Sequence, residues 1–420
     1  MIGSKRKIVK LPSRQDLAQG IARGAVAALA IALFATLAAS RPAFAQTESV
    51  LYNFCSLTNC ADGKEPNRNI VRDSEGNIYG TTMSGGQFGQ GVLYRVSPSG
   101  IETVLHDFGS TSTDGQVPYG LVADAAGNLY GTTQVGGSHI PPFQTVGGGT
   151  LFKMTPAGVY STLYNFAATR ADAEYPLAGP TLDSKGNTYG TTAYGGAYGN
   201  GTVYKIGPNG HETILHSFNN NGVDGYIPST EVAFDKNGNL WGTCTYGGHR
   251  GYGIIFEVSA SGVYSIRLNF GWTVSNAGYP VAGLTVDTAG NLYGLALSYT
   301  LSSLGAVYEV TRDTSGKWIE TNLIDFSSSG GNSPEAGVTF DSAGNLYGTT
   351  FQGGTLGYGT VYELTPGGEL TTLYNFDSTH GSGPNTNLLL DSAGNLYGTT
   401  PNGGSGNTGN GGGVLYEISR

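Results

Sequence analysis

Charged side chains are scarce in this chain: Asp, Glu, Lys and Arg make up only 12% of its 420 residues. Chemical signatures are scarce too. No H-x-H or H-E-x-x-H pair indicates zinc, and no D-x-D-x-D-G loop indicates an EF-hand calcium site. No G-x-S-x-G elbow, P-loop or Rossmann fingerprint is present either. The sequence therefore predicts no catalytic residue, no metal site and no cofactor, although weak calcium binding stays open.

Long apolar runs are confined to the N-terminus. A basic start at residues 5–14 precedes an Ala-rich stretch at 24–40 and the small-x-small site Ala43-Phe44-Ala45. This pattern is typical of a secretory signal peptide, here residues 1–45. The alternative is an uncleaved membrane anchor, for which a stretch of 17 residues is slightly short. We expect export to the periplasm or the exterior, with no membrane contact once the signal is removed.

Basic residues become scarcer still without this leader. Residues 1–45 contain seven of the 21 Lys and Arg but only one of the 30 Asp and Glu, so the remaining chain has a net charge of −15. Such a surface repels phosphate backbones, and nucleic acid is therefore not an expected partner.

Only three cysteines occur. Cys55 and Cys60 share a short polar loop, which in an exported protein indicates a disulfide. A metal pair is the less favoured alternative, because no second Cys or His pair accompanies them. Cys244 replaces a Thr within a repeat, and we expect it to be a buried, free thiol.

An internal repeat dominates what is present. The motif D-x-x-G-N-x-(Y/W)-G occurs seven times, at intervals of 50–59 residues, beginning at Asp73, Asp124, Asp183, Asp235, Asp287, Asp341 and Asp391. Asp at the first position and Gly at the fourth are typical of a tight turn between two strands. Each repeat contains four strand-like segments separated by such turns, as a propeller blade does.

The ends of the chain complete the count. A fourth-strand segment, residues 50–54, precedes the first repeat, and the last repeat stops after its third strand, residues 414–418. Pairing these two segments would finish the last blade and remove the exposed edges of an open array. We therefore predict an all-β fold: a seven-bladed β-propeller of four-stranded antiparallel blades over residues 46–420, closed by its N-terminal strand.

The repeated block G-N-L-Y-G-T-T, G-G, G-T-V-Y-E-L-T-P-G-G and L-Y-N-F resembles the bacterial GloVer tandem repeat, also called the choice-of-anchor repeat. Residues 344–376 contain every element in order, and blade five departs from the pattern at 295–297. The resemblance implies export and a propeller-like fold. Members of the family largely lack an assigned activity, so it implies no catalytic residues.

Candidate binding residues come from the loop that leads into each repeat. An Asp stands four residues before the first Pro of blades one to four, which gives Asp62, Asp114, Asp172 and Asp224. Such loops lie on one face of a propeller, so these residues and the nearby Glu174 predict an acidic arc for a cation or a sugar. The more economical interpretation is that each Asp shapes its own turn.

Three classes of function remain open. The favoured class is an exported, monomeric binding propeller whose partner is carbohydrate or an extracellular protein. The alternatives are a polysaccharide lyase or glycoside hydrolase that uses loop carboxylates, and a structural protein of the cell surface. Catalysis would require at least two loop carboxylates with raised or split pKa values, whereas binding requires only an aromatic and polar rim. The sequence therefore favours a binding protein over an enzyme and leaves the enzyme open as an alternative.

Overall fold

A computed structural model describes residues 47–142, 144–271, 278–297, 304–406 and 411–420. The described residues belong to one compact unit, Thr47–Arg420. The predicted signal peptide, residues 1–45, lies outside the described residues. Within the described ranges, no helix has the length and apolar character needed to cross a membrane.

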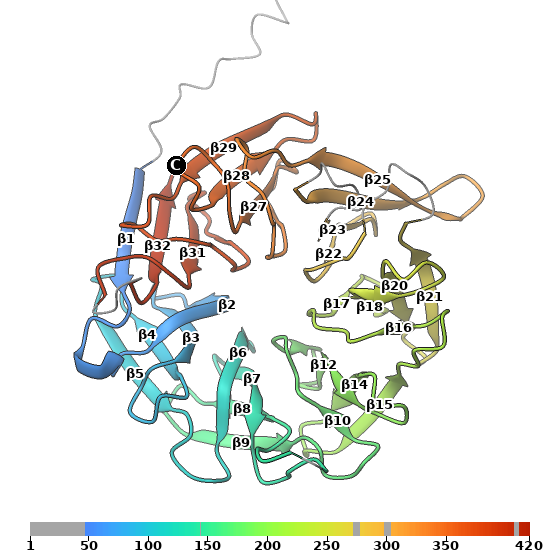
Figure 1. Ribbon diagram of the computed structural model, residues 1–420, viewed down its shortest axis with the longest axis horizontal. Coiled ribbons are helices and arrows are strands. Elements are labelled where there is room, and N and C mark those ends of the chain that lie inside the picture. The colour runs from blue at the N-terminus through green and yellow to red at the C-terminus, as the bar shows by residue number, and fades with distance from the viewer. Residues whose placement is uncertain (1–46, 143, 272–277, 298–303, 407–410) are drawn as a thin grey trace, which may run out of the picture. The chain divides into compact units, whose positions relative to one another are not determined.

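Seven four-stranded antiparallel sheets surround a central axis and form a β-propeller, as predicted (Figure 1). Blade 1 contains β2 (Lys64–Arg72), β3 (Ile78–Ser84), β4 (Val92–Val96) and β5 (Glu102–Asp107). Blade 2 contains β6 (Gly115–Ala123), β7 (Leu129–Gly136), β8 (Thr150–Met154) and β9 (Tyr160–Asn165). Blade 3 contains β11 (Thr181–Leu182), β12 (Thr188–Thr192), β14 (Thr202–Ile206) and β15 (Glu212–Ser217).

The other four blades repeat this order. Blade 4 contains β17 (Ala233–Phe234), β18 (Leu240–Cys244), β20 (Ile254–Val258) and β21 (Tyr264–Asn269). Blade 5 contains β22 (Thr285–Val286), β23 (Leu292–Ala296), β24 (Ala306–Arg312) and β25 (Trp318–Asp325). Blade 6 contains β26 (Thr339–Phe340), β27 (Leu346–Thr350), β28 (Thr360–Leu364) and β29 (Leu370–Asn375). Blade 7 contains β30 (Leu389–Leu390), β31 (Leu396–Thr400), β32 (Val414–Ser419) and β1 (Thr47–Asn53).

The N-terminal strand closes the ring. β1 pairs antiparallel with β32, with Thr47 opposite Ser419 and Asn53 opposite Val414. The two strands lie side by side although they come from opposite ends of the chain (Figure 1). The counting argument is thereby confirmed, because the outer strand of blade 7 comes from the start of the chain.

The turns of the repeat follow the predicted chemistry. In blade 1, Asp73 Oδ1 accepts hydrogen bonds from the backbone amides of Glu75 and Asn77, both at 2.9 Å. The other oxygen, Oδ2, accepts from Asn77 Nδ2 at 2.8 Å and from Tyr79 Oη at 3.0 Å. Gly76 has φ of +87°, a conformation that glycine adopts without strain. Hydrogen bonds within the turn therefore engage both carboxylate oxygens of Asp73, which confirms its interpretation as a capping residue.

The core lies between neighbouring blades. At each junction a Phe that ends an outer strand packs on an aromatic side chain from the third strand of the next blade. Seven such pairs have ring centroids 4.8–5.4 Å apart: Phe54–Tyr94, Phe108–Phe152, Phe166–Tyr204, Phe218–Phe256, Phe270–Tyr308, Phe326–Tyr362 and Phe376–Tyr416. One of these pairs lies at the junction between blades 7 and 1, so the same aromatic contact packs every blade against the next.

The connections of each blade emerge on two faces. Because the strands are antiparallel, the D-x-x-G turns share one side, which we call the turn face. The second-to-third-strand loops share the opposite side with the loops that enter the next blade, and we call this the loop face. On the loop face, β10 (Ala173–Glu174) pairs with β13 (Tyr194–Gly195), and β16 (Gly225–Tyr226) pairs with β19 (Tyr246–Gly247).

The cysteines lie as predicted. Cys55 and Cys60 form a disulfide in the first entering loop, around the short 3-10 turn η1 (Thr58–Cys60). Cys244 is buried and free within β18.

Candidate ligand-binding face

The four carboxylates of the predicted ligand site all belong to the loop face. Asp114, Asp172 and Asp224 are 6%, 4% and 8% exposed, and Glu174 is half-buried in β10. Each aspartate occupies the same position in successive entering loops. We therefore asked what each one contacts.

Asp114 is bonded from several sides. It accepts hydrogen bonds from the backbone amide and the hydroxyl of Ser110, at 3.1 and 2.8 Å. His106 Nε2 donates from the preceding blade at 3.1 Å, and Tyr160 Oη donates at 3.3 Å. Burial alone would raise the pKa of Asp114, but the bonds from His106 and Ser110 outweigh it and lower the pKa below its usual value. Asp114 therefore stays charged and fixes the loop.

Asp224 repeats this arrangement, and Asp172 varies it. His216 Nε2 and Tyr264 Oη donate to Asp224 at 2.9 and 2.7 Å, and the two rings stack with centroids 3.5 Å apart. Burial tends to raise the pKa of Asp224, but these bonds outweigh it and lower the pKa. At Asp172 the donor is Tyr164 Oη, at 2.9 Å. Each carboxylate thus joins its own loop to strands of the adjoining blades.

The structure assigns these aspartates to separate junctions. Among the described residues, no hydrogen bond links any two of Asp114, Asp172 and Asp224. Glu174 differs, because it lies two residues from Asp172. Burial, together with the charge of Asp172, raises its pKa. Over the same described ranges, no group of three or more His, Cys, Asp or Glu side chains is placed to hold a metal ion. A ligand role for the acidic arc stays a prediction.

A cluster of tyrosines lies on the same face, beside these loops. Tyr226 and Tyr246 are cross-strand partners of β16 and β19, and their rings stack with centroids 5.6 Å apart and planes 20° apart. Tyr279 lies 5.9 Å from Tyr246 and 5.4 Å from Tyr252, in both cases edge-on. We call these four residues and the pair Tyr175 and Tyr194, whose centroids are 5.8 Å apart, the tyrosine face.

The tyrosine face is a departure from the repeat. At the position of Tyr226 the other blades have Lys64, Gln116, Glu174, Gly278, Asn332 and Ser382. At the position of Tyr246 the described blades have Ser84, Val135, Tyr194, Gln352 and Asn402. The fold therefore does not require an aromatic side chain here. Tyr194 and Tyr246 are 47% and 42% exposed, so the cluster also adds little to the core.

The entering loops hold part of this face in a strained conformation. Tyr175 and Tyr279 each precede a proline and have φ of +59° and +58°, which is costly for a residue with a side chain. The Tyr279 amide donates to the Tyr252 carbonyl of the preceding blade at 2.8 Å. Equivalent bonds recur around the ring, as at Val117 and Ile227. The conformation thus belongs to the scaffold and fixes the rings in place.

The central channel is a second polar region. Asn69 Nδ2 of blade 1 donates to Glu231 Oε1 of blade 4 at 3.3 Å, across the axis. Gly120 and Gly179 take the place of these side chains in blades 2 and 3, where a Cβ on Gly120 would approach the Gly179 Cα to 2.8 Å. Arg68 lies over the Tyr119 ring nearby, 5.6 Å from its centroid. The innermost strands thus narrow the channel to a small polar constriction.

Sequence reasoning located the loop face but missed its tyrosines. The signal was present in the sequence. The six tyrosines of blades 3 to 5 fall on four equivalent loop positions of the repeat, where the other blades mostly have polar residues or glycine. Aligning the loops of the repeat, rather than only its strands, would have found it.

The model of a family described as the Gloeobacter/Verrucomicrobia repeat matches residues 40–256 and 235–420. The GloVer resemblance is thereby confirmed. No curated protein is similar enough in sequence to count as a relative.

Solved structures share the architecture at low identity. The extracellular domain of a hybrid two-component system from B. thetaiotaomicron has 11% identity and a TM-score of 0.53, with 89% of this chain and 41% of that chain covered. A gluconolactonase from Xanthomonas campestris has 12% identity and a TM-score of 0.45, with 78% and 89% covered. A luciferin-regenerating enzyme has 12% identity and a TM-score of 0.43, with 89% and 95% covered. The likeness to the extracellular domain, with a TM-score above 0.5, concerns the fold alone. Nothing further rests on the other two.

Proposed function

This chain belongs to the Gloeobacter/Verrucomicrobia repeat family, and from that starting point we propose that it is an exported binding propeller that holds carbohydrate on the tyrosine face. The stacked pair Tyr226 and Tyr246, with Tyr279 edge-on beside it, is the observation that carries the proposal. The pair combines aromatic surface, exposure and a rigid scaffold.

The chemistry of a tyrosine cluster suits a sugar. One face of a pyranose ring presents C–H groups that pack on an aromatic ring, while the hydroxyls stay in water or bond to polar neighbours. Tyrosine supplies both an apolar ring and a polar hydroxyl, which is why it is common where one side of a contact is wet. Its two rotatable angles also lose little entropy on binding.

The predicted carboxylates have two different roles in this proposal: one contacts the sugar, and the others fix the loops. Glu174 pairs with Tyr194 in the β10–β13 ladder, so its carboxyl lies at the edge of the tyrosine face and can bond to a sugar hydroxyl. Asp172 and Asp224 fix the two loops that carry Tyr175 and Tyr226. The acidic arc thus supports the site and contributes one direct contact.

Affinity electrophoresis in gels that contain soluble polysaccharides tests the proposal, followed by calorimetry with oligosaccharides of any polymer that retards the mature chain. The Tyr226→Ala/Tyr246→Ala double variant should lose at least tenfold in affinity. Each ring contact contributes on the order of 1 kcal/mol, and about 1.4 kcal/mol corresponds to a factor of ten. Tyr358→Ala is the matched control, because Tyr358 is 42% exposed on a loop of blade 6.

Two further arms separate the alternatives. Chromatography of the oligosaccharide after incubation detects shortened products, which would favour the hydrolase or lyase. Calcium titration of the parent and of Asp172→Asn/Asp224→Asn tests the acidic arc as a cation site. If no polysaccharide is retarded, or if the double tyrosine variant binds as the parent does, the proposed site is wrong.

A further inference from the structure

One cavity of the propeller lies at a break in its repeat. In each blade the Tyr or Trp of the D-x-x-G-N-x-(Y/W)-G motif faces the next blade. There it meets the side chain just before that blade's turn Asp. Phe234 meets Tyr189 with ring centroids 5.0 Å apart, and Phe340 meets Tyr293 at 4.9 Å. Both contacts are edge-to-face, a favourable aromatic geometry.

Other junctions fill the same space with other large side chains. The Arg72 guanidinium lies 5.2 Å from the centroid of the Tyr397 ring. Val286 packs in one hydrophobic cluster with Trp241. A large partner for the motif ring is thus a recurrent part of the blade interface.

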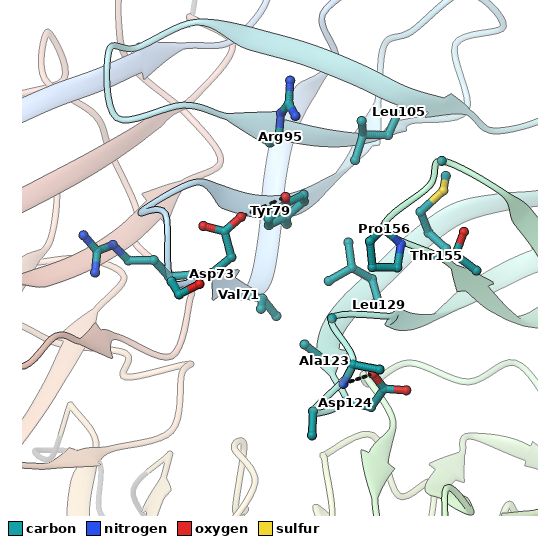
Figure 2. A pocket seen from close by; sticks show the side chains of 17 residues that line it. Val71, Asp73, Tyr79, Arg95, Leu105, Ala123, Asp124, Leu129, Thr155 and Pro156 are labelled. Atoms are coloured by element: carbon teal, nitrogen blue, oxygen red, sulfur yellow. Dashed lines mark hydrogen bonds between the residues drawn. The ribbon is translucent and has the colours of Figure 1, made fainter.

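Ala123 occupies this position between blades 1 and 2, opposite Tyr79. Ala123 lines a cavity of about 480 Å³ on the turn face, and the missing side chain accounts for part of this space. Figure 2 shows Tyr79 and Asp73 on one side of it and Ala123, Asp124 and Leu129 on the other. Val71, Leu105, Leu129 and Met154 line its interior. The volume falls within the usual range for small-molecule sites.

A guanidinium without a carboxylate partner borders this cavity. Arg95 Nη2 makes a long hydrogen bond of 3.4 Å to Thr103 Oγ1, and Arg95 Nε is buried without a partner. In the part of the chain that the structure describes, Arg95 forms no ion pair. Asp73 and Asp124, at the rim, already accept the hydrogen bonds of their turns. Arg72 also lines the cavity, but its guanidinium lies over the Tyr397 ring of blade 7. Of the two cations in this wall, Arg95 is the one opposite Tyr79 on the neighbouring strand, and its buried Nε has no hydrogen-bond partner.

We propose that this cavity binds a small aromatic carboxylate. Its phenyl ring takes the place that Phe234 and Phe340 fill at their junctions, against Tyr79. Its carboxylate pairs with the guanidinium of Arg95, whose planar fork matches two carboxylate oxygens. The site lies on the turn face and is independent of the proposed carbohydrate site on the loop face.

The expected affinity is modest. A ligand of about ten heavy atoms, at roughly 0.3–0.5 kcal/mol per atom, gives a Kd of about 0.1–10 mM. Without residues 1–45 the chain has a formal net charge of −15, which repels anions in general. Binding therefore depends on Arg95, and it weakens as salt is added.

The test uses benzoate, phenylacetate and 3-phenylpropionate, with their neutral amides as partners, observed by saturation-transfer NMR and calorimetry on the mature chain. At least one acid should bind at least tenfold more tightly than its amide. Ala123→Phe, which installs the side chain of blades 4 and 6, should abolish binding and raise the melting temperature. Arg95→Gln should reduce acid binding at least tenfold and remove the preference over the amide.

Two other junctions provide matched controls. Phe234→Ala opens a comparable space beside Tyr189, where Lys205 stands in the position of Arg95 and lies 5.7 Å from the ring centroid. This variant should gain a second acid site. Phe340→Ala opens the space beside Tyr293, where the corresponding residue is Glu309, and should gain none.

Three results would overturn the inference: none of the acids binds, the amides bind as well as the acids, or Ala123→Phe binds as the parent does. Should Ala123→Phe fail to fold, Arg95→Gln decides the question, because unchanged acid binding in that variant excludes the site. Neither result depends on carbohydrate binding, so the two proposals can fail separately.

Discussion

Replacing Phe54 by Ala tests whether the closing junction is as strong as a junction between blades that follow one another in the chain. Phe54 is fully buried, and its ring centroid lies 4.8 Å from that of Tyr94 in blade 1. Truncating a buried phenylalanine costs about 3–5 kcal/mol, from the lost transfer of the ring and the cavity it leaves. Phe54→Ala should therefore lower the free energy of unfolding by about that amount.

Phe376→Ala is the matched variant. Phe376 is equally buried and lies 5.0 Å from Tyr416, but it joins blade 6 to a strand of blade 7 that follows it in the chain. Guanidinium unfolding, followed by tyrosine fluorescence, should give equal losses for the two variants. Phe88→Ala, with a ring 42% exposed, should stay within about 0.5 kcal/mol of the parent. A loss below about 1 kcal/mol for Phe54→Ala, with a full loss for Phe376→Ala, would show that the N-terminal strand adds little to closure.

The remaining predictions concern pH, thiols and the closing strand. Burial, then the charges of Asp62 and Asp107, raises the pKa of Glu102 to about 7. Because the folded pKa lies above the unfolded value near 4.5, this group's stabilisation is complete below pH 4.5 and is lost as pH rises through 7. Glu102→Gln should therefore remove this loss, and its free energy of unfolding in urea at pH 8 should exceed that of the parent by about 1–3 kcal/mol. The exposed Glu369→Gln should follow the parent. If the free energy of unfolding changes with pH in the same way for all three chains, the prediction is wrong. Thiol titration should find one free cysteine, reactive only after unfolding, and three free thiols would exclude the disulfide. Deleting residues 47–53 should sharply lower the melting temperature, since it exposes the edge of β32, and an unchanged value would mean that β1 does not close the ring.

Much of the scaffold could be predicted because each repeat contains recognisable strand segments separated by turn residues. The one-strand surplus before Asp73 and the one-strand deficit after Asp391 fixed the closing pair. The turn role of Asp73 followed from its spacing to Gly76. The glycine of the second strand has a reason within its own blade, because a Cβ on Gly80 would collide with the side chain of its cross-strand partner Tyr94.

Contacts between blades were less predictable. The partners of Asp114 are His106, one blade earlier along the ring, and Tyr160, at the far end of its own blade. A repeat pattern gives the position of each strand but not which side chains from three segments meet at one point. For the same reason the cavity beside Ala123 could not be predicted. An alanine in a strand suggests no cavity until the structure shows that it lies opposite Tyr79 of the preceding blade.

The constriction between Asn69 and Glu231 has a consequence for transport. These side chains come from blades on opposite sides of the ring and bond to one another across it, so they obstruct the direct path between the two faces along the axis. In the two proposals, a carbohydrate on the loop face and an aromatic acid beside Ala123 would lie on opposite sides of this constriction, so each would leave by the face through which it entered.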